Sequence, residues 1–451
     1  MSWLPLLPFV FLPFYWAYLL LNTQPVIIFD AVAYDELGRQ IVNHGWGAYF
    51  HTLNREPLFP YLIACAMELS KTFGPLYHFF LKGILFVFLA MTLFGIYRLT
   101  RLLGAGRVAA GIGAFYAGIS PAILNSTLWL WSEAAALPWA VWGLFFFIKA
   151  WRSAKTGRGL RRVAAFALSS ALLFIGLLMV KAVVSAVVVL FGLSLLVTAV
   201  SFFVRRDTSR ALAFVVAAAV FLGVFTAAVE GYKAFNYQHN GNYALTTRFH
   251  WALYGNTARR MQPLSPDRIS QAVLSVPRLG FCERYYGQAC VFWSFQTSDE
   301  ISNQANAYCR ARGFSEAQQR KILMDSSFKM MSQQPLQEAL LSVLEGAKML
   351  FWENRVFFVH YPPVLSALYS QDLFVYTLCF GWAFFGLLAL AFAFTRRYSE
   401  YVLTAGFLLF FMGVHSIFFI DIRYALPVAP LFIVLVAAMF GRTAPRQLEQ
   451  D

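Results

Sequence analysis

Apolar stretches long enough to cross a bilayer alternate with short basic segments along most of the chain. A transmembrane helix needs about 20 predominantly apolar residues. Ten stretches come close to that length, and we expect each to be a membrane-spanning helix. They cover residues 3–21, 79–97, 108–125, 134–151, 163–180, 183–203, 211–230, 372–394, 401–418 and 424–440.

Positive charge follows every second span. The basic segments contain Arg98, Arg101 and Arg107, then Arg152 to Arg162, then Arg205, Arg206 and Arg210, then Arg396 and Arg397, and finally Arg442 and Arg446. Because Lys and Arg collect on the cytoplasmic side of membrane proteins, we expect both termini to be cytoplasmic. Met1 to Leu21 lacks a basic start and a cleavage site, so we interpret it as a retained first span.

Two further apolar segments carry too much charge to be spans. Pro57 to Thr72 contains Glu68 and Lys71, and counting it as a span would place every basic segment outside. We therefore expect a helix along the external membrane interface, within a first external loop at 22–78. Pro335 to Phe351, which contains Glu338, Glu345 and Lys348, is expected to be interfacial for the same reason.

These segments divide the chain into three parts: a membrane domain (1–230), a mostly α-helical external module (231–371), and C-terminal transmembrane helices with a cytoplasmic tail (372–451). In the external module, Ser315 followed by Gln318 predicts a capping box opening a helix that ends before Pro335. In the same module, the segment WALYGNTARR (251–260) mixes aromatic and basic residues. It suits sugar and phosphate contact or a loop on lipid headgroups, and we favour the headgroups.

Composition agrees with a membrane protein. Hydrophobic residues make up 59% of the 451 residues and aromatic residues 18%, and the mean hydropathy is +0.59. These values exclude a soluble domain and predict an all-α polytopic membrane protein in contact with membrane lipids. The formal charge of +14 lies in short runs between apolar segments rather than along one face, so we expect no nucleic-acid partner.

Three cysteines lie close together in the external module. Cys282 and Cys290 would close the most local disulfide, with Cys309 nearby. A zinc site is the alternative, although the paired spacing and neighbouring histidines that zinc prefers are missing.

The densest group of charged residues lies between Phe29 and Tyr61, in the first external loop. Asp30 suits a catalytic base or the N-cap of a helix over 31–44. Asp35 and Arg39 are four residues apart and can pair on that helix. Arg55 and Glu56 precede two prolines, which fits either phosphate binding or an anchor at the interface.

Other charged residues lie at predicted span ends. Glu133 follows Ser132 and either caps a helix or forms a second acidic site. Lys181, among apolar residues, must extend to the interface or bind an anion. Arg423 suits phosphate binding or pairing with Asp421.

His415 lies in the same C-terminal segment as Arg423. It either assists chemistry or is a hydrogen-bonded structural histidine.

Four features of the chain together resemble GT-C type polytopic glycosyltransferases. They are Asp30 with Tyr34, Arg55-Glu56-Pro57-Leu58-Phe59-Pro60, Ser132-Glu133, and HSIFFIDIRYALPVAPLF (415–432). The similar groups are the bacterial glycosyltransferase family 39, the protein O-mannosyltransferases and the aminoarabinose transferases of lipid A. The resemblance implies sugar transfer from a polyprenyl-phosphate-linked donor to a lipid, glycan or protein acceptor. It further implies a bacterial inner membrane protein whose active site faces the periplasm.

The resemblance also implies residue roles. Asp30 and Glu133 would be catalytic, Arg55, Lys181 and Arg423 would bind the donor phosphate, and Tyr34, Glu56, His415 and Tyr424 would contact substrate. Two positions depart from the family pattern: Ala31 stands where glutamate commonly follows the aspartate, and Ala182 replaces a proline. A requirement for Mg²⁺ or Mn²⁺ stays open.

Two rival functions fit the same composition. A transporter or flippase of lipid-linked sugars would also need cations within the membrane, but it predicts inverted repeats and broken helices in matching halves, which the sequence does not show. An O-antigen-type polymerase or ligase would transfer a preassembled glycan.

Overall fold

The computed structural model describes residues 7–51, 55–74, 76–246, 249–276, 279–354, 359–396, 399–418 and 422–441. Almost all of these residues are helical. The one sheet among them has two short antiparallel strands, β1 (Gln24–Pro25) and β2 (Val359–His360), with Gln24 opposite His360. This sheet joins the segment between α1 and α2 to the segment before α17.

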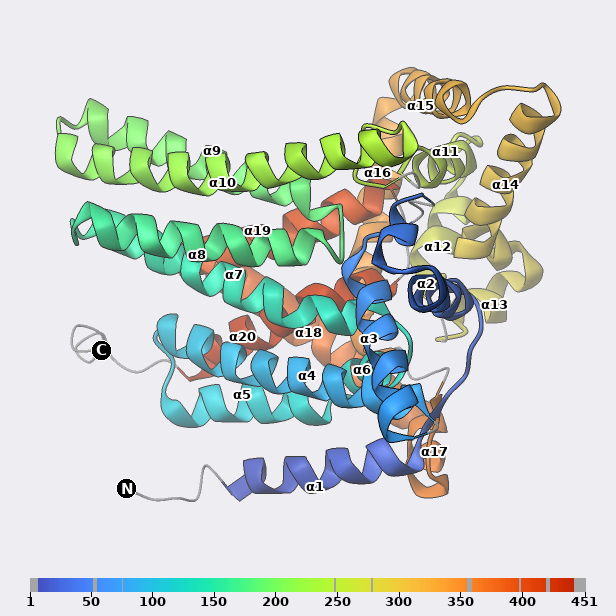
Figure 1. The fold of residues 1–451 in the computed structure, drawn as a ribbon, viewed down its shortest axis with the longest axis horizontal. Helices are drawn as coiled ribbons and strands as arrows, with labels where there is room; N and C mark the ends of the chain where they lie inside the picture. Colours follow the sequence, from blue (N-terminus) through green and yellow to red (C-terminus); the bar gives the residue numbers. More distant parts are fainter. Residues whose placement is uncertain are drawn as a thin grey trace.

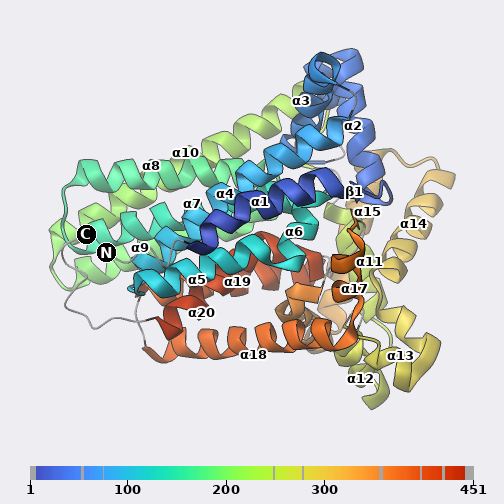
Figure 2. The same ribbon diagram turned by 90° about the horizontal axis from the view of Figure 1, so that it is seen from below.

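Long apolar helices form a bundle in which they run roughly side by side (Figures 1 and 2). The bundle contains α1 (Leu7–Asn22), α4 (Tyr77–Leu102), α5 (Arg107–Ile119), α6 (Pro121–Leu128), α7 (Ser132–Lys155), α8 (Leu160–Leu178), α9 (Val184–Val204), α10 (Thr208–Asn240), α18 (Asp372–Arg396), α19 (Ser399–Phe418), the 3₁₀ segment η5 (Ile422–Val428) and α20 (Ala429–Phe440).

The predicted all-α polytopic membrane architecture is confirmed, with a smaller number of full-length spans than the predicted ten. Eight described helices are long and apolar enough to cross a membrane. The predicted span 108–125 is instead a pair, α5 and α6, bent by 48°. The bend follows from Ser120, which caps α6, and Pro121, which starts it. Of the predicted span 3–21, the first residues lie outside the described part of the chain, and the described part gives an apolar helix over Phe9–Asn22.

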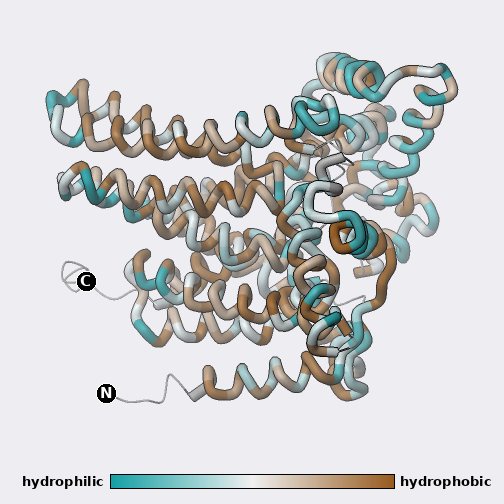
Figure 3. The backbone as a smooth tube through the Cα atoms, in the orientation of Figure 1, coloured by the Kyte–Doolittle hydropathy of each residue, from teal (hydrophilic) through white to brown (hydrophobic). Residues whose placement is uncertain are grey.

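A second layer of shorter helices covers one end of the bundle, on the right in Figure 1. It contains α2 (Asp30–His44), η2 (Trp46–His51), α3 (Leu58–Phe73), α11 (Phe249–Arg260), α12 (Pro266–Leu274), α13 (Phe281–Tyr286), η3 (Gly287–Trp293), α14 (Phe295–Ala311), α15 (Glu316–Gln333), α16 (Pro335–Ala347), η4 (Lys348–Asn354) and α17 (Pro363–Ser370). We call it the extramembrane layer. Figure 3 shows the contrast between the apolar bundle and this more polar layer.

The helix order places the basic connections at the other end of the bundle. α1 begins and α20 ends there, on the left in Figure 1. The connections α4–α5, α7–α8, α9–α10 and α18–α19 turn at the same end, which agrees with the alternation of charge in the sequence. Arg397, Arg442 and Arg446 lie outside the described residues.

The interfacial predictions have different outcomes. α3 lies across the bundle end and packs on α2 and α4, so the segment is not a span. In α16, Glu338 and Glu345 are buried, and they pair with Arg260 and Arg259 of α11 (Arg260 Nη2 to Glu345 Oε2, 2.8 Å). The expectation that 251–260 rests on lipid headgroups was therefore wrong, because its two arginines are held inside the protein by carboxylates.

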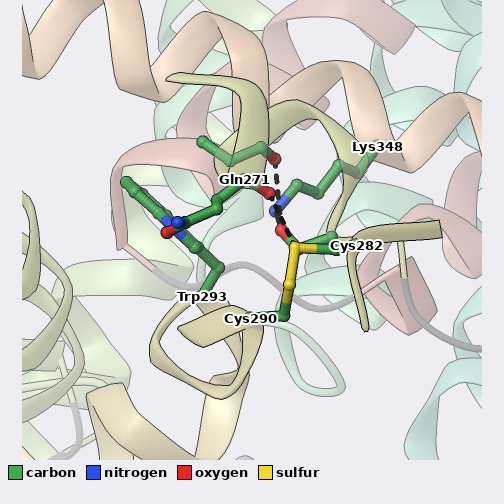
Figure 4. Close-up of a disulfide and its surroundings, with 7 residues drawn as sticks. Gln271, Cys282, Cys290, Trp293 and Lys348 are labelled. Atoms are coloured by element: carbon green, nitrogen blue, oxygen red, sulfur yellow. Dashed lines mark hydrogen bonds between the residues drawn. A yellow bond between two sulfur atoms is a disulfide. The ribbon is translucent and has the colours of Figure 1, made fainter. Parts of the chain in front are cut away.

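Local signals in the extramembrane layer explain how it folds. Ser315 and Gln318 form the predicted capping box at the start of α15, which ends before Pro335. Cys282 and Cys290 form a disulfide. Figure 4 shows it beside Gln271, whose side chain accepts a hydrogen bond from Trp293 Nε1 (3.3 Å) and whose carbonyl oxygen lies 3.6 Å from the Cys282 sulfur. The disulfide therefore joins α13, which contains Cys282, to η3, which contains Cys290.

Candidate functional site

A cavity of about 830 Å³ lies where the bundle meets the extramembrane layer. Its walls come from α2, the segment before α3, the start of α7, the α8–α9 turn, α10, α11, α15, the end of α19 and η5. All the predicted site residues of the membrane part line it: Asp30, Tyr34, Arg55, Glu56, Glu133, Lys181, His415, Arg423 and Tyr424. Residues far apart in the sequence thus meet in one chamber.

Asp30 is the first residue of α2, and its carboxylate binds two arginines. Arg55 Nη2 lies 2.6 Å from Oδ1, and Arg423 Nη2 lies 2.7 Å from Oδ2. Phe29, rather than Asp30, is at the N-cap position, with a φ of 51° that residues with a β-carbon rarely adopt. The N-cap interpretation of Asp30 was therefore wrong. Asp421, the other candidate partner of Arg423, lies outside the described residues.

Both arginines are held in place by aromatic side chains. The Arg55 guanidinium lies 4.2 Å from the centre of the Tyr34 ring, and the Tyr34 hydroxyl donates to Ser132 Oγ (3.1 Å). Arg423 Nη2 donates to the Tyr424 hydroxyl (3.0 Å). The side chains of Arg55 and Arg423 are only 8% and 9% exposed. Such burial strengthens any interaction they make with an anion.

Lys181 and Glu133 form a second ion pair in the cavity, with Nζ 2.8 Å from Oε1. Burial favours the neutral lysine, but the interactions with Glu133, Tyr34, Tyr424 and Glu56 together outweigh burial and raise the pKa of Lys181 above its usual value. Lys181 therefore stays cationic. It does not extend to the interface, because it points to a carboxylate and to the Tyr424 ring, 5.3 Å away.

Glu56 positions the segment that carries Arg55. Its Oε1 accepts a hydrogen bond from the Ala182 amide (2.9 Å), and the Leu58 amide donates to the Met179 carbonyl (3.0 Å). These bonds tie the start of α3 to the α8–α9 turn. Arg55 and Lys181 are thereby fixed relative to each other.

His415 has the structural contacts that the sequence analysis allowed. Its Nδ1 lies 3.0 Å from the Phe411 carbonyl oxygen, and its ring stacks on Tyr424 at a centroid distance of 5.1 Å. Because Tyr424 contacts both Arg423 and Lys181, His415 supports the aromatic wall behind two cations.

The cavity also has an apolar wall that reaches the lipid-facing surface of the bundle. Val183 and Val189 of the α8–α9 region and Phe225 and Val229 of α10 line it. Val189 is 54% exposed, so the cavity extends to the outer edge of the α9–α10 contact. A ligand with an apolar tail fits this arrangement.

Several cavity residues were missed in the sequence. Glu230, Lys233, Tyr243, His250, Trp251 and Arg320 line the part of the cavity next to the extramembrane layer. They come from the end of α10, from the connection between α10 and α11, from α11 and from α15. Spacing in the sequence gave no signal for them, because only the fold brings α15 over the end of α10.

A metal site was left open by the sequence. In the part of the chain that the structure describes, no three His, Cys, Asp or Glu residues group to hold a metal ion. A requirement for Mg²⁺ or Mn²⁺ stays a prediction to test.

Comparison with known proteins adds one structural similarity. No family model matches the chain, and no curated protein matches it. The chain is similar to the archaeal oligosaccharyltransferase AglB from Archaeoglobus fulgidus, solved in complex with an inhibitory peptide and a dolichol-phosphate, with 14% identity and a TM-score of 0.46. The match covers 90% of this chain and 46% of AglB, so this chain spans less than half of that protein's length. It assigns no residue role to this chain.

Proposed function

We propose that the protein is a GT-C type membrane glycosyltransferase that takes a sugar from a polyprenyl-phosphate-linked donor. One observation carries the proposal: Asp30 lies between two buried arginines in a cavity whose apolar wall reaches the lipid-facing surface. The cavity thereby offers, in one place, cations that can bind an anionic lipid headgroup and a carboxylate that can accept a proton. The acceptor is a lipid, a glycan or a protein.

The donor phosphate would bind Arg55, Arg423 and Lys181. Guanidinium groups bind phosphate oxygens in pairs through charge-assisted hydrogen bonds, and lysine adds a point charge. The polyprenyl chain would leave the cavity past Val189, between α9 and α10. The three cations are largely buried, so they would act on the phosphate at low dielectric.

Donor binding would also free the base. Arg55 and Arg423 are already paired with Asp30, so a phosphate must compete with this carboxylate for them. Once displaced, Asp30 can accept a proton from the acceptor hydroxyl or amine. The acceptor oxygen or nitrogen then bonds to the anomeric carbon, and the bond from that carbon to the phosphate oxygen breaks. The phosphate leaves with the electron pair, stabilised by the cations.

The cavity would face the outside of the cell. The basic connections lie at the opposite end of the bundle, and basic connections mark the cytoplasmic side. In a bacterium this orientation places the cavity on the periplasmic side of the inner membrane. Glu133 would hold Lys181 and contact the acceptor or the donor sugar as a second acidic residue.

The test is to incubate the purified protein with a series of labelled polyprenyl-phosphate monosaccharides and the lipids, glycans and proteins of a strain that lacks it. Transfer of label to one of these acceptors supports the proposal. Movement of intact donor across a vesicle membrane without transfer would point to a flippase. Loss of only long glycans from the deletion strain, with no monosaccharide transfer, would point to a polymerase or ligase.

A further inference from the structure

The charged residues of the cavity are unevenly paired. Five cationic and four acidic side chains line it among the described residues. Arg55 and Arg423 pair with Asp30, Lys181 pairs with Glu133, and Lys233 Nζ lies 2.7 Å from Glu230 Oε1. Arg320 differs, because no carboxylate of the described residues forms an ion pair with it. Its partner is the Asn242 side-chain oxygen (2.9 Å), and its Nε is buried without a hydrogen-bond partner.

Arg320 lies on α15, with Met324 one turn further on, and both side chains line the cavity. Its neighbours are the end of α10 and the start of α11. α10 has 33 residues, well beyond the roughly 20 that cross the hydrocarbon layer. Its last turns, which carry Glu230 and Lys233, therefore project into the headgroup region or the water. The cavity thus has an inner part around Asp30 and an outer part around Arg320.

The outer part has the chemistry of a site for an anionic, sugar-like group. The guanidinium of Arg320 is half-buried, and its Nε–H has no hydrogen-bond partner, so this group can bind an oxyanion. Burial, together with the charge of Arg320, lowers the pKa of His250 to about 4, so that histidine is a neutral hydrogen-bonding group near pH 7. Trp251 and Tyr243 add aromatic side chains to the same wall. Aromatic faces pack well on sugar rings.

We propose that the outer part of the cavity is the acceptor subsite and that the acceptor carries a phosphate or carboxylate group, which Arg320 binds. The word acceptor rests on the proposed transferase function, whereas the binding of an anion by Arg320 does not. The three inner cations (Arg55, Lys181 and Arg423) are balanced by three carboxylates (Asp30, Glu56 and Glu133), and Lys233 is balanced by Glu230, so the excess positive charge of the cavity lies at Arg320. An anion in the outer part would therefore find a cation without first displacing a carboxylate.

The first experiment titrates inorganic phosphate into the full-length protein in phosphatidylcholine nanodiscs and follows the heat of binding. Arg320→Gln should weaken phosphate binding in the outer part of the cavity about 10-fold or more, because a charge-assisted hydrogen bond is lost. Arg320→Lys should retain part of it. Any phosphate that binds at Arg55 and Arg423 binds the unmodified protein and both variants alike. The difference in phosphate binding between them therefore reports on Arg320.

Two controls separate binding from structure. Arg310→Gln removes an exposed arginine of the extramembrane layer that does not line the cavity, and it should change nothing. Asn242→Ala removes the partner of Arg320 but keeps its charge, and it should keep phosphate binding. Equal binding by Arg320→Gln and the unmodified protein would overturn the inference. The inference would also be overturned if Asn242→Ala lost as much phosphate binding as Arg320→Gln, since the effect would then be structural.

A second arm identifies the source of the anion. Nanodiscs that contain phosphatidic acid are analysed by native mass spectrometry for lipid retained on the protein. Retention that falls in Arg320→Gln supports a lipid acceptor, and a change confined to the phosphate titration supports a water-soluble glycan or protein. Failure of sugar transfer with intact Arg320-dependent binding would refute the transferase and leave the anion site standing. Sugar transfer without phosphate binding by Arg320 would support the transferase and refute the anion site.

Discussion

Lys181 and Glu133 form a buried ion pair, with Nζ 2.8 Å from Oε1, between the α8–α9 turn and the first turn of α7. The Glu133 side chain is only 3% exposed. A buried charge that loses its partner is strongly destabilising, whereas removing both charges often is not. The pair therefore gives a direct test of how the site is held together.

We expect Lys181→Met to destabilise the protein by about 3–5 kcal/mol, because Glu133 is left buried and unpaired. The double variant Lys181→Met with Glu133→Gln should recover most of this loss. Thermal unfolding in detergent measures both. A double variant as unstable as the single one would show that the pair does not determine stability at this position.

The α9–α10 edge of the cavity should admit the polyprenyl chain. Val189→Trp places an indole where the apolar wall reaches the surface, and we expect transfer from a long-chain donor to fall about 10-fold or more. Val197→Trp is the matched control, because Val197 is 68% exposed on the same helix but does not line the cavity. Equal activity of the two variants would place the chain elsewhere.

Glu345 should make the extramembrane layer sensitive to acid. Burial opposes its ionisation, but Arg259, Arg260 and Lys348 together outweigh burial and lower the pKa of Glu345 to about 2. A depressed folded-state pKa contributes stability that is fully present above the ordinary value of 4.5 and is lost as the pH falls towards 2.

The measurement is the free energy of unfolding of the protein and of Glu345→Gln as a function of pH. The variant should be less stable by about 3–5 kcal/mol at pH 7, because the buried Arg259 loses its carboxylate partner and Arg260 keeps only Glu338. The difference should shrink below pH 4.5. A constant difference between pH 7 and pH 3 would contradict this account of the cluster.

The disulfide should stabilise the extramembrane layer without affecting chemistry. Cys282 and Cys290 are eight residues apart, and closing so short a loop contributes about 2 kcal/mol. Replacing both by serine should speed proteolysis around α13 and leave sugar transfer unchanged, since neither residue lines the cavity. Cys309→Ser, which removes a buried free cysteine, is the control. Loss of transfer in the paired-serine variant would show that the site depends on this region.

Much of the architecture could be predicted because lipid imposes simple rules. Runs of about 20 apolar residues and the alternation of basic segments predicted the spans and their order. The bends and ends of helices were harder to predict, because capping residues, proline and glycine set them within apolar runs. Ser120 and Pro121 bend the predicted span 108–125 into two helices. Asp207 caps α10, and Gly241, in the left-handed conformation, ends it well past the predicted end at 230.

Among the site residues, charges in the membrane part could be predicted because each is costly there. Their partners could not be predicted, because Asp30 meets Arg423 only after the first loop and the last span come together. Polar residues of the extramembrane layer carry no such signal. Arg320 resembles any solvated arginine in the sequence, and Arg260 resembles a headgroup contact, although it is fully buried.

The central claim is that Asp30 is the base and that donor phosphate displaces it from Arg55 and Arg423. The most direct measurement compares donor binding and sugar transfer for the protein and for Asp30→Asn, with a defined polyprenyl-phosphate monosaccharide. We expect transfer to be abolished while donor binding is kept or tightened, because the two arginines no longer share a carboxylate. Full turnover by Asp30→Asn would contradict the account.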